Sequence, residues 1–270
     1  MEGRTVPHDE GLMKERSLEE SLVLGSGNRL TTDPNDKTKP LVVRGVIKRD
    51  HVNQCIKDGR DFYYIDTGYL GNFPSVGNPS GKKIWHRVVK NENQHSTIKE
   101  VPSDRWERLV EQDPRLEWKG WKNHDKKILL VMPNPKACKY YNFDYDEWVE
   151  ETKDKISRYT GLPVETRIKG SRSERNKGYT IHDALDSGTY ATVAFNSIAA
   201  LESVLYGVPA FVSVPCAAAP LSSFDLSQLD APFKPSEELI VKQCRHVAYG
   251  QFTIEEIENG TAYELTERYS

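Results

Sequence analysis

Short apolar runs alternate with amphipathic segments along most of the chain. The short runs are rich in β-branched and aromatic residues, which is the pattern of buried strands. Strands are predicted at 41–46, 62–66, 84–90, 127–132, 164–168, 191–195 and 209–214. Between them, helical spacing of apolar residues predicts helices at 50–57, 104–110, 145–159, 181–185, 198–206, 235–249 and 254–259. This alternation predicts an α/β fold with largely parallel sheets.

The same pattern predicts how the chain divides. Residues 1–39 are polar and charged, so we expect a mobile N-terminal arm with one short helix around Leu18–Leu24. Residues 40–124 and 125–232 each alternate strands with helices, which predicts two Rossmann-like lobes facing a cleft. Residues 233–270 are predicted to be closing helices that bridge the lobes.

The segment Tyr190–Val214 is the most informative, because it has the pattern of strand, turn, helix and strand. Asn196 and Ser197 can cap the helix through their side-chain oxygens, and Gly207 is suited to its end. Such a helix points its positive end at the carboxyl edge of a parallel sheet, where phosphates bind. The alternative is an ordinary buried crossover without a ligand.

Glu202 lies a turn inside this predicted helix, on the face that carries Ile198. A carboxylate at this place is within reach of a ligand at the helix start, and it can accept hydrogen bonds from both hydroxyls of a nucleotide ribose. The alternative is a glutamate at the solvated edge of the helix.

The segment Arg167–Lys177 is strongly basic and leaves the carboxyl end of a predicted strand. Lys169, Arg172 and Arg175 are therefore candidates for binding a donor diphosphate or a nucleic-acid backbone. Its alternative is a solvated run of charge. Gly45, after the first strand, is a weaker candidate for close approach of the backbone to a phosphate or sugar.

Asp66 ends a predicted strand and precedes a loop rich in glycine. A carboxylate facing a cleft from this position can deprotonate an acceptor hydroxyl, which makes Asp66 the candidate general base. Its alternative role is to cap its own turn. His86 and His51 are the fallback bases.

The acceptor is expected on the same side of the cleft as Asp66. Tyr69 and Phe73 can stack on an acceptor ring, although aromatic residues in loops also simply hold loops in place. Arg87 lies on the strand predicted at 84–90 and can reach the cleft.

Composition limits the classes of function. The net charge of −3 argues against a protein that coats nucleic acid by charge alone, but it allows a local basic groove. No apolar run approaches the length of a membrane span, so no membrane partner is predicted. The scattered cysteines predict reduced thiols in a cytoplasmic protein and no structural zinc. No H-E-x-x-H pattern is present, and the predicted reaction needs no metal.

The spacing S-x-x-x-x-E-x-x-x-x-G-x-P, formed by Ser197, Glu202, Gly207 and Pro209, resembles the donor-binding helix of GT-B glycosyltransferases. The resemblance covers mainly Lys126–Pro232. It implies that the helix start holds the pyrophosphate of a nucleotide sugar and that the glutamate holds its ribose. Retaining members have a second glutamate eight positions before the first, where this chain has Ala194, so an inverting reaction is expected.

The segments LVVRGVIKRDHVNQCIKDGRDFYYIDTGYLGN and WHRVVKN resemble bacteriophage proteins that glycosylate hydroxymethylated DNA bases. This resemblance implies a nucleotide sugar as co-substrate without a further cofactor, DNA as a partner, a flipped base as acceptor and the host cytoplasm as location. Two alternatives stay open: a noncatalytic module that binds a nucleotide or nucleic acid, and a nucleotide-sugar epimerase.

Overall fold

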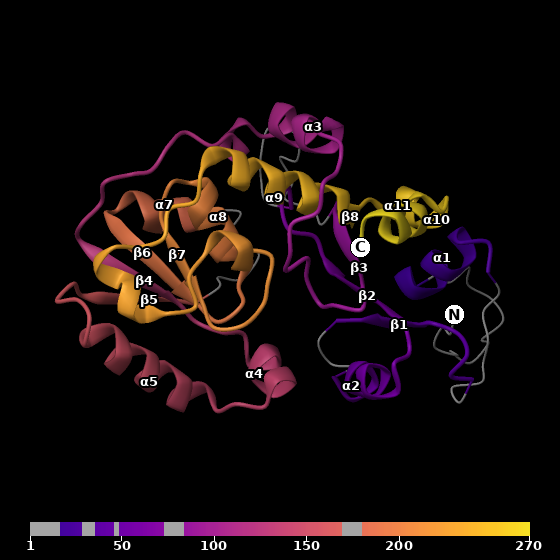
Figure 1. Cartoon of the computed structure of the whole chain (residues 1–270), viewed down its shortest axis with the longest axis horizontal. Coiled ribbons are helices and arrows are strands. Elements are labelled where there is room, and N and C mark those ends of the chain that lie inside the picture. The colour runs from indigo at the N-terminus through magenta and orange to yellow at the C-terminus, as the bar shows by residue number, and fades with distance from the viewer. Residues whose placement is uncertain (1–16, 29–35, 46–48, 73–83, 169–179) are drawn as a thin grey trace, which may run out of the picture.

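The computed structural model of the chain describes residues 17–28, 36–45, 49–72, 84–168 and 180–270. Within these residues, the strands form two separate four-stranded sheets in a mixed α/β fold (Figure 1). Sheet A has the strand order β1-β2-β3-β8, and sheet B has the order β5-β4-β6-β7. The predicted α/β class is therefore confirmed.

Sheet A consists of β1 (Leu41–Arg44), β2 (Phe62–Thr67), β3 (His86–Lys90) and β8 (Gln251–Phe252). Strand β1 pairs with β2 in parallel, whereas β2–β3 and β3–β8 are antiparallel. The expectation of a largely parallel sheet is wrong here. A parallel neighbour needs a crossover connection, and the Gly- and Pro-rich sequence between β2 and β3 has no helical pattern to supply one.

Sheet B consists of β4 (Lys127–Val131), β5 (Val164–Arg167), β6 (Thr189–Ala194) and β7 (Ala210–Val212), and all its pairings are parallel. The prediction of a parallel sheet is therefore confirmed for sheet B. Its connections contain the helices α4 (Pro135–Tyr141), α5 (Tyr145–Ser157), α7 (Ile181–Asp186) and α8 (Ile198–Leu205). Helix α4 was not predicted, although Asn134 caps it and Pro135 opens it. All four strands end at one edge, which is where α/β sheets bind ligands.

Sheet A is accompanied by α1 (Leu18–Gly25), α2 (Arg49–Asp58), α10 (Ile254–Glu258) and α11 (Thr261–Tyr269). Helix α1 differs from the expected mobile arm, because Leu22 and Val23 are fully buried in a core shared with Phe252 and Ile257. The end of α1 also packs closely against the end of α10. A Cβ added at Gly25 would lie 2.3 Å from the carbonyl oxygen of Ile257 and 3.0 Å from the backbone nitrogen of Gly260. Residues 18–25 are therefore a packed element, held by helices from the other end of the chain.

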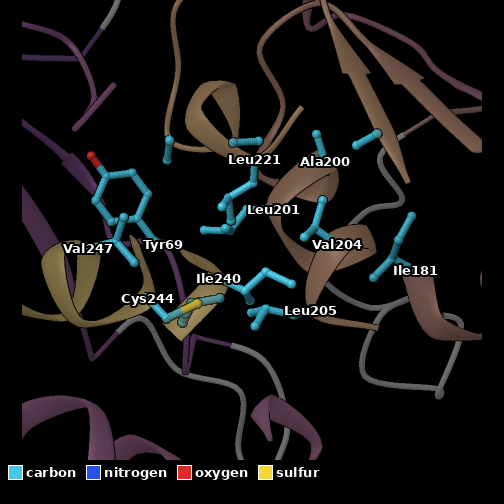
Figure 2. Packing of buried hydrophobic residues seen from close by; sticks show 14 of the residues in the cluster. Tyr69, Ile181, Ala200, Leu201, Val204, Leu205, Leu221, Ile240, Cys244 and Val247 are labelled. Atoms are coloured by element: carbon cyan, nitrogen blue, oxygen red, sulfur yellow. The ribbon is translucent and has the colours of Figure 1, made fainter. Parts of the chain in front are cut away.

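The largest hydrophobic core lies between the two sheets. It joins Tyr69 and Leu70, which follow β2, to Leu201 and Val204 of α8. Helix α9 (Glu237–Tyr249) runs between the sheets and adds Ile240, Cys244 and Val247 to this core, as Figures 1 and 2 show. Helix α3 (Asp104–Gln112) and the 3-10 turns η2 (Pro114–Leu116), η3 (Ala219–Leu221) and η4 (Leu226–Asp230) complete the described elements. The two halves thus share one continuous apolar core.

Candidate functional site

The connection from β6 to α8 lies at the carboxyl edge of sheet B. Ser197 caps α8, because its Oγ accepts a hydrogen bond from the backbone N–H of Ala199 at 3.2 Å. Gln94, which follows β3 of sheet A, donates from Nε2 to the carbonyl oxygen of Asn196 at 3.1 Å. The predicted cap is confirmed at Ser197, and the start of α8 is tied to the other half of the chain through Asn196.

Glu202 is half-buried and lies on the wall of a pocket built from four separate segments. These are the residues after β2, the turn η2, the start of α7 and the body of α8. The lining consists of Leu70, Gly71, Asp113, Arg115, Leu116, Thr180, Ile181, His182, Glu202 and Leu205. Glu202 therefore faces residues from both halves of the chain. Asn196 and Ser197 are not part of this lining, so the helix start and the pocket are two neighbouring places rather than one.

Arg115 is the positive charge of the pocket. It binds Asp113 through two parallel hydrogen bonds, Nε to Oδ1 and Nη2 to Oδ2, each of 2.8 Å. The hydrogen bonding to Asp113 raises the pKa of Arg115, and the charge of Glu202 raises it further. Bidentate pairing with a nearly buried carboxylate fixes the plane of the guanidinium. Among the described residues that line the pocket, Arg115 is thus a fixed cation, and Asp113 and Glu202 are carboxylates.

His182 is a further titratable residue on the wall of the pocket. Its ring lies almost parallel to the ring of Tyr206, with centroids 4.7 Å apart and an angle of 22° between the planes. Burial lowers the pKa of His182, and the neighbouring charge of Arg115 lowers it further. The ring is therefore neutral at pH 7. Among the described residues, none forms a hydrogen bond with it.

Asp66, the candidate base, lies at the end of β2 and is partly exposed. Its Oδ1 accepts from the backbone N–H of Thr67 at 2.7 Å, which is the local capping that the sequence left open as an alternative. Its Oδ2 accepts from the Tyr64 hydroxyl at 3.1 Å and from Nη2 of Arg87 at 3.2 Å. Both oxygens are therefore already bound, and a catalytic role requires one of them to turn toward an acceptor.

Arg87 is buried, which differs from the expected place in an open cleft. Besides Asp66, its guanidinium donates to the carbonyl oxygens of Asn93 and Thr67 at 3.0 and 2.8 Å. It also lies over the rings of Tyr64 and Tyr69, about 5.5 Å from each centroid. Arg87 orders the end of sheet A, and its donors point to protein atoms rather than to an acceptor.

Tyr69 is also buried rather than presented to an acceptor, with 1% of its surface exposed. Its hydroxyl oxygen accepts from the backbone N–H of His95 and lies 2.9 Å from Nδ1 of the same residue. The side chain of Gln251 binds the backbone N–H of Tyr69 at 2.8 Å. The ring of Tyr69 therefore holds its loop in place, which was the alternative to stacking on an acceptor ring.

Gly45 has a φ of +71°, a conformation that favours glycine, and no atom of the described residues would lie within 4 Å of a Cβ added there. As far as the described residues go, its surroundings allow the close approach of a ligand. Lys169, Arg172, Arg175 and Phe73 lie outside the described residues. The fallback base His86 is buried on β3, and His51 is exposed on α2.

No group of three or more His, Cys, Asp or Glu side chains with metal-binding geometry occurs within the described parts of the chain. No helix in those parts combines the length and the apolar character needed to cross a membrane. All four cysteines are buried free thiols. Independence from metal stays a prediction.

Comparisons with known proteins were made for the sequence and for the fold. No protein-family model and no curated protein matches the chain. Among solved structures, it is similar to Thermosulfurimonas dismutans KpsC, beta Kdo 2,4 transferase, with 12% identity and a TM-score of 0.49 over 91% of this chain and 93% of that chain. It is also similar to T. dismutans KpsC, beta Kdo 2,7 transferase, with 14% identity and a TM-score of 0.46 over 86% of each chain. With both TM-scores below 0.5, neither likeness decides the fold or the activity of this chain.

Sequence reasoning missed several residues that build the site. Asp113 and Arg115 follow α3 in a segment without a recognisable motif. Nothing in this segment indicates that its side chains lie near Glu202. His182 belongs to no motif and lies five residues after the end of the basic segment Arg167–Lys177. Gln94 carries no local signal at all. Only the tertiary fold brings these side chains to α8.

Proposed function

We propose that this protein is a glycosyltransferase that transfers a sugar from a nucleotide-sugar donor to an acceptor hydroxyl. The observation that carries the proposal is the position of Glu202, on the wall of a pocket lined by both halves of the chain, close to the carboxyl edge of a parallel sheet. A carboxylate in such a pocket can accept a hydrogen bond from a ribose hydroxyl. The S-x-x-x-x-E-x-x-x-x-G-x-P spacing supports the same role.

The charges of the pocket indicate how the donor lies. Glu202 and Asp113 are negative and Arg115 is positive, so the pocket is unfavourable for a diphosphate and suits the uncharged nucleoside. The diphosphate then extends toward Asn196, Ser197 and the positive end of α8. In this proposal Lys169, Arg172 and Arg175 supply its counter-charges, and the open space beside Gly45 accommodates the sugar or a phosphate.

The two sheets are proposed to act as two GT-B lobes, with the donor on sheet B and the acceptor on the side of sheet A. An inverting reaction without a metal needs a base opposite the leaving group, and Asp66 is the candidate at the end of β2. Its contact with Arg87 keeps the carboxylate at this edge.

A hydroxymethylated base in DNA is the acceptor that the sequence predicts. Basic side chains on α2, α4 and the end of β1 support an anionic acceptor, and helices α2 and α4 lie next to each other in Figure 1. Lys136 and Lys139 are exposed on α4, and Arg44 is exposed at the end of β1. Arg49 at the start of α2 is close enough to influence the pKa of Tyr140 in α4. Such cations can bind phosphates of a DNA strand.

The proposal is tested by incubating the full chain with a panel of nucleotide sugars, including nucleotide-activated Kdo, with and without hydroxymethylated DNA. We expect nucleotide release that depends on one donor and on the acceptor, with the mass of the sugar added to the DNA. Unmodified DNA of the same sequence is the control for the acceptor hydroxyl. A changed sugar epimer without transfer identifies an epimerase, and tight nucleotide binding without any turnover identifies a binding module. Either result contradicts the proposal.

A further inference from the structure

His182 lies in the same pocket as Glu202. Within the part of the chain that the structure describes, its ring stacks on Tyr206 and neither ring nitrogen forms a hydrogen bond. An imidazole carries two polar atoms, and polar groups that become buried normally have hydrogen-bond partners. A half-buried histidine on a pocket wall, with no partner for either nitrogen among the described residues, is therefore suited to a ligand that would bury it.

The ring is placed rigidly, because Tyr206 is itself fixed from two sides. The Tyr206 hydroxyl donates to the Asp186 carboxylate, and Nζ of Lys122 lies 3.3 Å from the centroid of the Tyr206 ring. Lys122 and Asp186 also pair with each other at 2.9 Å. This arrangement makes a rigid surface against which the imidazole of His182 lies flat. A polar group held in one orientation discriminates between ligands better than a mobile one.

The charged groups around His182 come from three segments. Arg115 and Asp113 face it from η2, and Asp183 and Asp186 lie on its own helix. Glu202 lines the same pocket from α8. Burial and Arg115 together outweigh these carboxylates and lower the pKa of His182, so the neutral ring presents one N–H donor and one nitrogen acceptor. A hydroxyl group also both donates and accepts one bond, which makes it a matching partner.

We propose that His182 is a specificity-determining residue of the Glu202 pocket, where its ring binds one hydroxyl of the donor ribose while Glu202 binds the other. This inference rests on the proposed function, and it adds that the site selects ribonucleotides over deoxyribonucleotides. A deoxyribose lacking the hydroxyl opposite His182 covers the ring nitrogen without giving it a partner. Sites built to bind a hydroxyl reject analogues that lack it for this reason.

The test compares three ligands of one nucleobase on the full chain by calorimetry. They are the ribonucleoside diphosphate, its 2′-deoxy form and its 3′-deoxy form, for the best-bound of the adenine, cytosine, guanine and uracil series. We expect each deoxy form to bind the wild-type protein about tenfold more weakly, the equivalent of one hydrogen bond. In His182→Phe, which keeps an aromatic ring on Tyr206, the penalty for one of the two deoxy forms should disappear while the other remains.

Tyr206→Phe is the matched control, because it alters the supporting surface and leaves His182 in place. It should preserve both deoxy penalties. His182→Gln restores a donor and an acceptor and should recover part of the lost discrimination. Equal weakening of all three ligands in His182→Phe, or unchanged penalties, overturns the inference while the proposed function stands. Failure of the wild-type protein to bind any nucleotide overturns both.

Discussion

Arg87 donates from Nη2 to Oδ2 of Asp66 over 3.2 Å, and the arginine is the more deeply buried partner, with 8% of its side chain exposed against 31% for the aspartate. Burial disfavours the charged guanidinium, but Asp66, Tyr69 and Tyr64 more than offset this and raise the pKa of Arg87. Asp66 is therefore the carboxylate that compensates the buried guanidinium, whereas the aspartate itself reaches toward solvent at the end of β2.

Replacing Arg87 should destabilise the fold. Arg87→Met removes the partner of Asp66 and leaves two carbonyl oxygens without their donor. We therefore expect a loss of about 2–4 kcal/mol in the free energy of unfolding. The loss is not larger because Asp66 is partly solvated. Urea unfolding measures it. Lys90→Met, which removes exposed pairs with Asp61 and Glu267, is the control and should cost under about 1 kcal/mol. Equal effects of the two substitutions would contradict the structural role of Arg87.

Replacing Asp66 separates catalysis from folding. Asp66→Asn keeps the shape of the side chain and can still accept from Arg87, but it cannot take a proton. If Asp66 is the base, turnover should fall by roughly a hundred- to ten-thousand-fold while nucleotide affinity and unfolding change little. The measurement is the rate of nucleotide release at saturating donor. A variant that folds and turns over normally limits Asp66 to its contacts with Thr67 and Arg87.

Gly250 should not tolerate a side chain. A Cβ added there would lie 2.0 Å from Cε1 of His95, whose ring is wedged between Tyr69 and His246. Gly250→Ala should therefore lower stability by about 1–3 kcal/mol through overpacking, which thermal unfolding detects. Gly161→Ala is the control, since a Cβ at Gly161 has no atom within 4 Å. A Gly250→Ala protein as stable as the control would contradict this packing.

Stability should fall as the pH decreases below about 6.5, the ordinary pKa of histidine. Burial, followed by the influence of His246 and Arg87, lowers the pKa of His95 well below that value in the folded protein. The unfolded chain then binds the proton first, so each pH unit down to the folded pKa costs about 1.4 kcal/mol for this group. Burial also lowers the pKa of His246 and His182, which act in the same direction.

The measurement is urea unfolding at about pH 7.5 and pH 5.5, a window above the range in which most carboxylates titrate. His95→Gln can still accept from the Tyr69 hydroxyl and should show a flatter dependence on pH. An equally steep dependence in this variant would assign the effect to other groups.

The sequence was sufficient for elements whose signals are local. Helix α8 was predicted at 198–206 and is observed at Ile198–Leu205, because the cap, the apolar spacing and Gly207 all lie within the segment. Helix α4 was missed because Pro133 and Pro135 follow the strand predicted at 127–132 and proline commonly ends a strand, whereas proline is also favourable at the first position of a helix. Helix α8 was predicted because its local signals all indicate the same element. Helix α4 was missed because a proline can either end a strand or begin a helix.

Long-range pairing was not predictable. Helix α1 is weakly amphipathic, and its Leu22 and Val23 become core residues only through packing against sheet A and the C-terminal helices α10 and α11. Strand β8 is too short to give a period, yet it closes sheet A against β3. At the site, the spacing after β6 indicated Glu202, but nothing local to Arg115 shows that it lies near that glutamate.

The central claim is that Glu202 binds the nucleotide half of the donor, and calorimetry with the best-bound nucleotide tests it most directly. Glu202→Gln keeps the size of the side chain and removes its charge, so nucleotide affinity should fall by about 1.5–3 kcal/mol, the contribution of hydrogen bonds to a charged group. Glu151→Gln, on the exposed face of α5, is the control and should bind like the wild-type protein. Unchanged affinity in a folded Glu202→Gln protein would contradict the account.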